Sequence, residues 1–220
     1  MAEKVSQKLS VLDSHFAYLR LQKGKLEPFA RQRLHWHQLY EEDLWRSYVE
    51  MRPHLPERCW ALLDIGSGLG GIDVLLSRHY GTQPFLNLLD GIDDPPEMRV
   101  HRETFSSERV ARDFMRVNGV RSDRVIYYGP NATAGDLAKP YDLVLSLGSW
   151  CFHYEPNEYL PRLLVGGGLG VGARLIVDLR AGKSEWAAQL AGAGFRAVAI
   201  IRDEQKYQRI VMDRAWTPLP

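Results

Sequence analysis

The stretch ALLDIGSGLGG, residues 61–71, decides the fold of this chain. It is a short apolar run that ends in a glycine-rich turn, and Ile72–Leu76 then continue with helical spacing. A strand, a tight turn and a helix in this order predict the first βα unit of a nucleotide-binding α/β sheet. Gly66, Gly68 and Gly71 match the G-x-G-x-x-G spacing of a dinucleotide site, but S-adenosylmethionine binds to the same geometry. The turn alone therefore leaves both ligands open.

The composition describes an ordinary globular protein. The 220 residues include 45% hydrophobic and 25% charged residues, and the net charge of +1 gives no reason to expect a nucleic-acid partner. Cys59 and Cys151 belong to no CxxC pair or zinc pattern, so we expect reduced thiols and no metal site. A polar N-terminus and the lack of a membrane-length apolar run predict a cytoplasmic protein without a membrane partner. A homodimer is left open.

The segment before the glycine turn is helical and aromatic. Apolar residues recur at three- and four-residue steps from Pro28 to Met51, and we expect residues 1–56 to form a helical cap on a domain of residues 57–220. One hypothesis is that this helix covers the edge of the sheet, as we expect for Trp45 and Tyr48. The other is that it is a lid over the active site, whose ligand-facing residues would be His35, Trp36, His37 and Tyr40.

The rest of the chain predicts an α/β fold. Five apolar runs predict strands that alternate with helices or loops, at residues 60–65, 85–90, 124–128, 141–147 and 174–179. The segment between the third and fourth strands is too rich in glycine and proline for a normal helix. Two final strands, 195–201 and 207–212, are joined by five residues, too few for a crossover helix, so they must be antiparallel.

These features together resemble the class I S-adenosylmethionine-dependent methyltransferases over residues 60–213. Asp64–Gly70 fit the motif D/E-x-G-x-G-x-G, and Asp90 fits the acidic residue that ends the second strand. The closing hairpin is the topological signature of that family. The resemblance implies a Rossmann-like three-layer sandwich with a mostly parallel seven-stranded sheet, strand order 3-2-1-4-5-7-6 and a C-terminal antiparallel hairpin. It implies S-adenosyl-L-methionine as the cofactor.

Asp73 gives a second reason to prefer this cofactor to NAD. It follows the glycines in the first helical turn, near the position of a dinucleotide pyrophosphate, where a carboxylate would repel the phosphates. The alternative is that Asp73 only complements the helix dipole. An NAD-dependent oxidoreductase stays the rival interpretation.

The resemblance also implies the roles of individual residues. Asp64 would lie near the amino end of the methionine moiety, and Gly66, Ser67 and Gly68 would let the backbone approach the cofactor. Asp90 would bind both ribose hydroxyls. The remaining predicted cofactor contacts are Gly91 and Ile92 beside the adenine, Asn131 and Asp136 in the shortened loop, and Ser146 at the end of the fourth strand.

The residues that follow the fourth strand would handle the substrate. The stretch SLGSWCFHY, residues 146–154, lacks the (D/N/S)-P-P-(Y/F) motif of amide and base N-methylases. His153 is either a general base for a hydroxyl acceptor or a structural histidine. Trp150 and Tyr154 either wall a substrate pocket or belong to the core. This segment resembles one in bacterial sugar and small-molecule O-methyltransferases.

We expect Asp178, at the end of the fifth strand, either to pair with Arg180 or Lys183 or to face the substrate.

The resemblance and the residues after the fourth strand lead us to expect a methyltransferase that acts on a small molecule, with O-methylation of a hydroxyl on a sugar or a natural-product-like acceptor. A methyltransferase of RNA or protein, or a non-catalytic nucleotide-binding module, is the alternative.

Overall fold

A computed structural model describes residues 6–15, 29–81, 84–90, 108–152 and 155–215, with backbone only for residues 29–39. Four residues with predicted roles lie outside this part of the chain: Gly91, Ile92, His153 and Tyr154.

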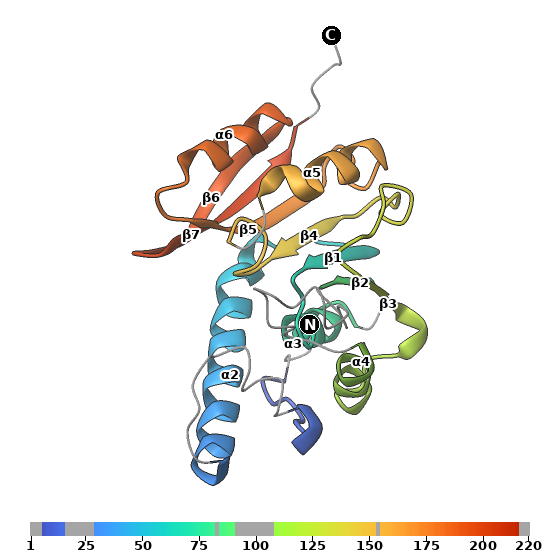
Figure 1. Cartoon of the computed structure of the whole chain (residues 1–220), viewed down its shortest axis with the longest axis vertical. Helices are drawn as coiled ribbons and strands as arrows, with labels where there is room; N and C mark the ends of the chain where they lie inside the picture. Colours follow the sequence, from blue (N-terminus) through green and yellow to red (C-terminus); the bar gives the residue numbers. More distant parts are fainter. Residues whose placement is uncertain (1–5, 16–28, 82–83, 91–107, 153–154, 216–220) are drawn as a thin grey trace, which may run out of the picture.

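A seven-stranded sheet runs through the centre of the molecule in the order β3-β2-β1-β4-β5-β7-β6 (Figure 1). The strands are β1 (Ala61–Ile65), β2 (Phe85–Leu89), β3 (Val125–Tyr128), β4 (Leu143–Ser146), β5 (Arg174–Arg180), β6 (Phe195–Glu204) and β7 (Tyr207–Arg214). The first five are parallel, and β7 is antiparallel to both β5 and β6. The predicted strand order and closing hairpin are confirmed.

Helices cover both faces of the sheet, as a parallel sheet requires. The helices are α2 (Phe29–Met51), α3 (Gly71–His79), α4 (Glu108–Val117), α5 (Pro156–Val165) and α6 (Ser184–Gly192), with short 3₁₀ turns η1 (Arg52–His54) and η3 (Ser122–Arg124). Figure 1 shows α5 and α6 on one side and α2, α3 and α4 on the other. Side chains of β1 alternate between the two cores: Leu62 packs with the α3 side, whereas Leu63 and Ile65 pack with the α5 side. Asp64 therefore points to the α3 side.

The hairpin differs in one detail from the prediction. Of the five residues expected to join its strands, the first three extend β6 to Glu204, and only Gln205 and Lys206 make the turn. Two register shifts, at Ala197/Ala199 and Ile200/Arg202, accompany the longer strand. A two-residue turn is enough for antiparallel neighbours, so the polar residues could continue the ladder.

The long helix α2 is part of the main core. Tyr48 and Met51 are buried in the same cluster as the side chains of α3, and Trp45 packs on Tyr48 with ring centroids 5.2 Å apart. The expected covering role of Trp45 and Tyr48 fits this packing. Leu9, from the short N-terminal stretch, is buried in the same cluster. The described part of residues 1–56 thus shares one hydrophobic core with the sheet.

Candidate functional site

The glycine turn between β1 and α3 has the backbone that its sequence demands. Gly66, Gly68 and Gly70 have φ of 82°, 57° and 80°, a region that residues with a Cβ rarely adopt. The N–H groups of Gly66 and Ser67 both donate to the carbonyl of Leu89, at 2.7 and 3.3 Å. The turn is therefore fixed against the carboxyl end of β2.

Side chains from two other segments close over this turn. A Cβ on Gly66 would lie 2.0 Å from the Cβ and Oγ of Ser149, in the loop after β4. A Cβ on Gly71 would lie 2.3 Å from the hydroxyl oxygen of Tyr40, on α2, and the N–H of Gly71 donates to that oxygen. Tyr40 thus contacts Gly71 and packs against the core on the α3 side, and its role toward a ligand stays a prediction. The side chains of Trp36 and His37 are not described.

Asp90 lies at the end of β2 and faces the same turn. Its Oδ2 accepts a hydrogen bond of 2.5 Å from the N–H of Gly68, although the two residues are 22 positions apart. The backbone N–H of Asp90 donates to the carbonyl of Tyr128, which ties it also to β3. The two parts of the predicted cofactor motif are thus in direct contact at the carboxyl edge of the sheet.

A pair of buried carboxyl groups lies beneath the turn. Asp64 is 3% exposed and Asp73 is not exposed at all, and their carboxyl groups lie next to each other. Burial raises the pKa of Asp73 to about 7, and burial, followed by the neighbouring Asp73, raises the pKa of Asp64 well above its usual value. Two ionised carboxylates side by side repel each other, so this contact favours a proton on one of the two groups.

The groups that the structure describes around this pair supply no positive charge. Burial and the charges of Asp73 and Asp64 raise the pKa of Tyr40, and burial is also the main cause of the raised pKa of Tyr127. Neither oxygen of Asp73 receives a hydrogen bond from another donor in the described residues, apart from its own backbone N–H. Neutral tyrosines and acids therefore surround the pair.

The end of β4 holds the loop that was expected to contact ligands. The Oγ of Ser146 donates to the carbonyl of Ile65 and accepts from the N–H of Trp150, both at 2.8 Å. The indole of Trp150 is fully buried, and its Nε1 donates to the carbonyl of Glu155. Both side chains are fully buried and hydrogen-bonded within the protein, so in this structure they belong to the core. Cys151, next in the chain, adopts a positive φ of 66° where the loop bends.

The shortened connection between β3 and β4 is a series of turns, as predicted. Asn131 is exposed there. Asp136 accepts hydrogen bonds from the N–H and Oγ1 of Thr133, and these bonds lower the pKa of Asp136. The role of Asn131 at the adenine stays a prediction, whereas Asp136 has a structural function in this turn.

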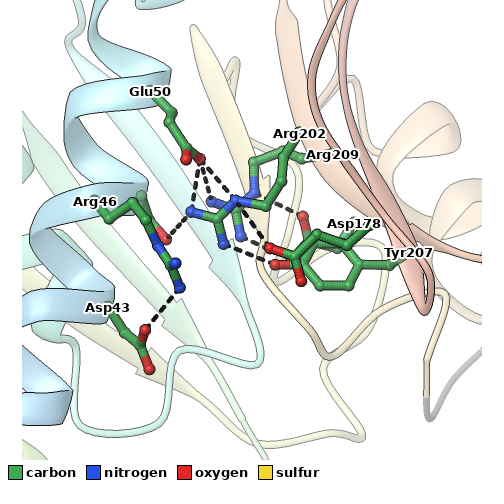
Figure 2. A network of polar contacts seen from close by, with 9 residues as sticks. Asp43, Arg46, Glu50, Asp178, Arg202, Tyr207 and Arg209 are labelled. Atoms are coloured by element: carbon green, nitrogen blue, oxygen red, sulfur yellow. Dashed lines mark hydrogen bonds and ion pairs between the residues drawn. The ribbon is translucent and has the colours of Figure 1, made fainter.

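A second polar cluster, which the sequence did not predict, joins α2 to the hairpin (Figure 2). Asp178 is 2% exposed, and its carboxylate accepts two hydrogen bonds from Arg209, at 2.7 and 2.9 Å. Arg202 contacts Glu50 of α2 at 2.6 Å and donates to the hydroxyl of Tyr207 at 2.7 Å. We call these five residues the hairpin network.

Asp178 was expected to pair with Arg180 or Lys183, and that partner was wrong. Residues 178 and 209 are direct neighbours across the β5–β7 ladder, so the pairing depends on strand register, which the sequence does not display. The sequence does contain one signal for this pairing, because Asp178 and Arg209 each lie inside an apolar strand. Buried charges are normally paired, so an acidic and a basic residue in such positions are candidate partners. The network lies beside the loop after β4, since Phe152 contacts the ring of Tyr207, with centroids 5.8 Å apart.

The described part of the chain has neither a candidate metal site nor a candidate membrane-spanning helix. Within it, no group of three or more histidines, cysteines and acids could hold a metal ion. No helix in it is both long and apolar enough to cross a membrane.

No protein-family model and no curated protein matches the sequence. Solved structures do match the fold. One is the N,N-8-amino-8-demethyl-D-riboflavin dimethyltransferase RosA from Streptomyces davawensis, with a TM-score of 0.54 and 15% identity over 91% of this chain and 68% of that chain. Another is an O-methyltransferase family 2 protein from Planctomyces limnophilus, in complex with apigenin, with a TM-score of 0.53 and 18% identity over 90% of this chain and 66% of that chain.

A third match is a ribosomal protein L11 methylase from Lactobacillus delbrueckii subsp. bulgaricus, with a TM-score of 0.54 and 13% identity over 82% of this chain and 80% of that chain. This chain spans only part of each of these proteins. The names of these proteins indicate a flavin derivative and a ribosomal protein as substrates, so one fold serves different acceptors. At these identities the matches establish the fold alone, which this chain shares with the three methyltransferases.

Proposed function

We propose that this chain is an S-adenosylmethionine-dependent methyltransferase of a small molecule, with a hydroxyl group as the acceptor. The observation that carries the cofactor assignment is the contact between Asp90 and the N–H of Gly68. It brings the acid expected at the ribose to the turn expected beside the methionine moiety. A carboxylate accepts several hydrogen bonds, so its bond to Gly68 is compatible with binding of ribose hydroxyls.

The residues of the site fit this cofactor better than a dinucleotide. S-Adenosylmethionine would supply a methyl group on a positively charged sulfur atom. Asp64 and Asp73 form an acidic site beneath the turn, which favours a ligand with positive charge and opposes a pyrophosphate. Asp64 would hold the amino end of the methionine moiety, and Asp90 would orient the ribose.

The acceptor assignment depends on the segment after β4. His153 follows Cys151 and Phe152, which leave the carboxyl edge of a central strand, and an imidazole can take the proton of a hydroxyl as oxygen becomes methylated. The absence of the amide and base N-methylase motif from residues 146–154 favours oxygen as the acceptor atom. His153 is proposed as the general base, with Tyr154, Trp36 and His37 in the acceptor site.

Titration calorimetry tests the cofactor. We expect S-adenosylhomocysteine to bind in the micromolar range and NADH to give no heat, because the turn offers acids where a dinucleotide needs positive charge. Binding of NADH without binding of S-adenosylhomocysteine would reject the cofactor proposal.

Release of S-adenosylhomocysteine, followed over a panel of sugars and phenols, tests the acceptor class. With an active acceptor, His153→Ala should lower turnover by about 10²–10⁴-fold at unchanged cofactor affinity. His35→Ala and His37→Ala are the matched variants from the proposed lid. Full activity of His153→Ala would remove that residue from the mechanism, and activity on RNA or protein alone would reject the small-molecule assignment.

A further inference from the structure

The acidic pair beneath the glycine turn has no counter-charge in the described residues. Asp64 comes from β1 and Asp73 from the first turn of α3, and their carboxyl groups contact each other. The N-terminus of α3 stabilises negative charge, but a helix terminus is equivalent to only about half a unit charge. It can stabilise one ionised carboxylate there, and a second remains uncompensated.

Every titratable group known to face the pair is acidic. Tyr40 approaches from α2, Tyr127 from β3, and Asp90 from the end of β2. Two ionised carboxylates in contact, away from water and without a cation, repel each other strongly, so such pairs retain one proton.

The two acids differ in what a ligand can reach. Asp73 is fully enclosed, whereas Asp64 keeps 3% of its surface exposed and lies two positions before Gly66, where the glycine turn begins. A ligand on the turn can therefore contact Asp64 but not Asp73. Asp73 can affect that ligand only through Asp64, as a positioning residue.

We propose that Asp64 and Asp73 share one proton in the free protein, and that a ligand with a positive charge binds at Asp64 and displaces this proton to the solvent. This inference rests on the proposed function for the identity of the ligand, whose ammonium group belongs to the methionine moiety. No bond other than that to the proton breaks, and the cation of the ligand replaces the charge of the proton. Asp73 thereby couples cofactor binding to pH.

The coupling predicts that the affinities of two nucleosides depend differently on pH. S-Adenosylhomocysteine carries the ammonium group, and 5′-methylthioadenosine lacks the amino-acid moiety but keeps the adenosine. If one proton is displaced, the affinity for S-adenosylhomocysteine should rise about tenfold between pH 5.5 and pH 7, whereas that for 5′-methylthioadenosine should stay constant.

Calorimetry in two buffers of different ionisation enthalpy measures the displaced proton directly. For the wild-type protein at pH 6 we expect close to one proton released per S-adenosylhomocysteine bound and none per 5′-methylthioadenosine. Equal proton release for both nucleosides, or none for either, would overturn the inference while leaving the proposed cofactor intact. If neither nucleoside binds, the proposed function fails and the ligand half of the inference fails with it.

Asp73→Asn is the decisive variant, because its amide donates to Asp64 without a titrating proton. It should abolish both the proton release and the rise of affinity with pH. Asp123→Asn, an exposed acid paired with Arg121 on η3, is the matched control and should behave as the wild type. A wild-type response from Asp73→Asn would overturn the role of Asp73.

Infrared titration of the ligand-free protein tests whether Asp64 and Asp73 hold a proton. We expect the carboxylic-acid band of the wild type at pH 6 to lose one group in Asp73→Asn and none in Asp123→Asn. An unchanged band would show that the pair holds no proton. If Asp73→Asn does not fold, the two-buffer calorimetry on the wild type still accepts or rejects the coupling.

Discussion

Two clusters of buried acids lie on different parts of the sheet, and they are neutralised differently. In the hairpin network, Asp178 receives two hydrogen bonds from Arg209, and Glu50 contacts Arg202. Beneath the glycine turn, Asp64 and Asp73 contact each other, and no guanidinium of the described residues is known to contact either of them. A buried acid with a guanidinium partner serves the structure, whereas a buried acid without one is poised to bind a cation or a proton. The comparison separates residues that hold the fold from residues available for function.

The largest effect should come from removing the guanidinium of the hairpin network. Arg209→Met leaves the buried carboxylate of Asp178 without its partner, which we expect to cost about 3–5 kcal/mol of the free energy of unfolding. Urea denaturation measures it. Asp178→Leu combined with Arg209→Met removes both charges and should be much closer to the wild type. Equal losses in the single and double variants would show that packing, not charge pairing, dominates.

The next effect concerns cofactor affinity. Asp90→Ala removes a charged acceptor of two ribose hydroxyls and should weaken S-adenosylhomocysteine binding by about 1.5–3 kcal/mol, as measured by calorimetry. It also removes the acceptor of the Gly68 N–H, so we expect about 1 kcal/mol of lost stability. Asp123→Asn, at an exposed acid of η3, is the control. An unchanged dissociation constant for Asp90→Ala would place the ribose elsewhere.

Much of the fold could be predicted because its signals are local. The apolar run before Gly66, the glycines and the five residues before Tyr207 determine a strand, a turn and a hairpin without reference to distant parts of the chain. The strand order came from the family resemblance, and the structure agrees with it.

The site was predictable only where its residues are fixed by the same local signals. Asp64 and Asp90 end adjacent strands, so their approach to the glycine turn follows from the topology. The partner of Asp178 and the contact between Asp73 and Asp64 depend on register and on the placement of α3 over β1, which no residue pattern displays. Ser146 and Trp150 were predicted to contact ligands because the sequence places them where β4 meets the carboxyl edge of the sheet. That their side chains pack inward could not be read from the sequence.

The acidic pair should also affect stability in a pH-dependent way. The pKa of Asp73 is raised in the folded protein to about 7, so the folded state binds more protons than the unfolded state between pH 4 and pH 7. The associated stability is present at low pH and is lost as pH rises toward 7. Asp73→Asn does not titrate, so its free energy of unfolding relative to the wild type should increase between pH 5.5 and pH 7, by on the order of 1–2 kcal/mol. A constant difference from pH 5 to pH 8 would argue against the shared proton.

The smallest effect tests whether the hairpin network holds α2 in place. Glu50 and Asp43 both lie on α2, and each contacts an arginine, but Glu50 contacts the nearly buried Arg202 of β6 whereas Asp43 contacts the exposed Arg46 of its own helix. Exposed ion pairs within a helix contribute about 0.3–0.5 kcal/mol, because water screens them. Glu50→Gln should therefore cost about 1 kcal/mol and Asp43→Asn less than half of that.

The more specific readout of this pair of variants is amide hydrogen exchange in α2. Arg202 joins the helix to β6, so weakening its contact should speed exchange in the last turns of α2, near Tyr48 and Met51, and in β6 around Arg202. Asp43→Asn should leave both segments as protected as in the wild type. Faster exchange in α2 without a change in β6 would mean that Glu50 stabilises only its own helix. Equal exchange in all three proteins would show that the packing of α2 on α3 holds the helix without the hairpin network.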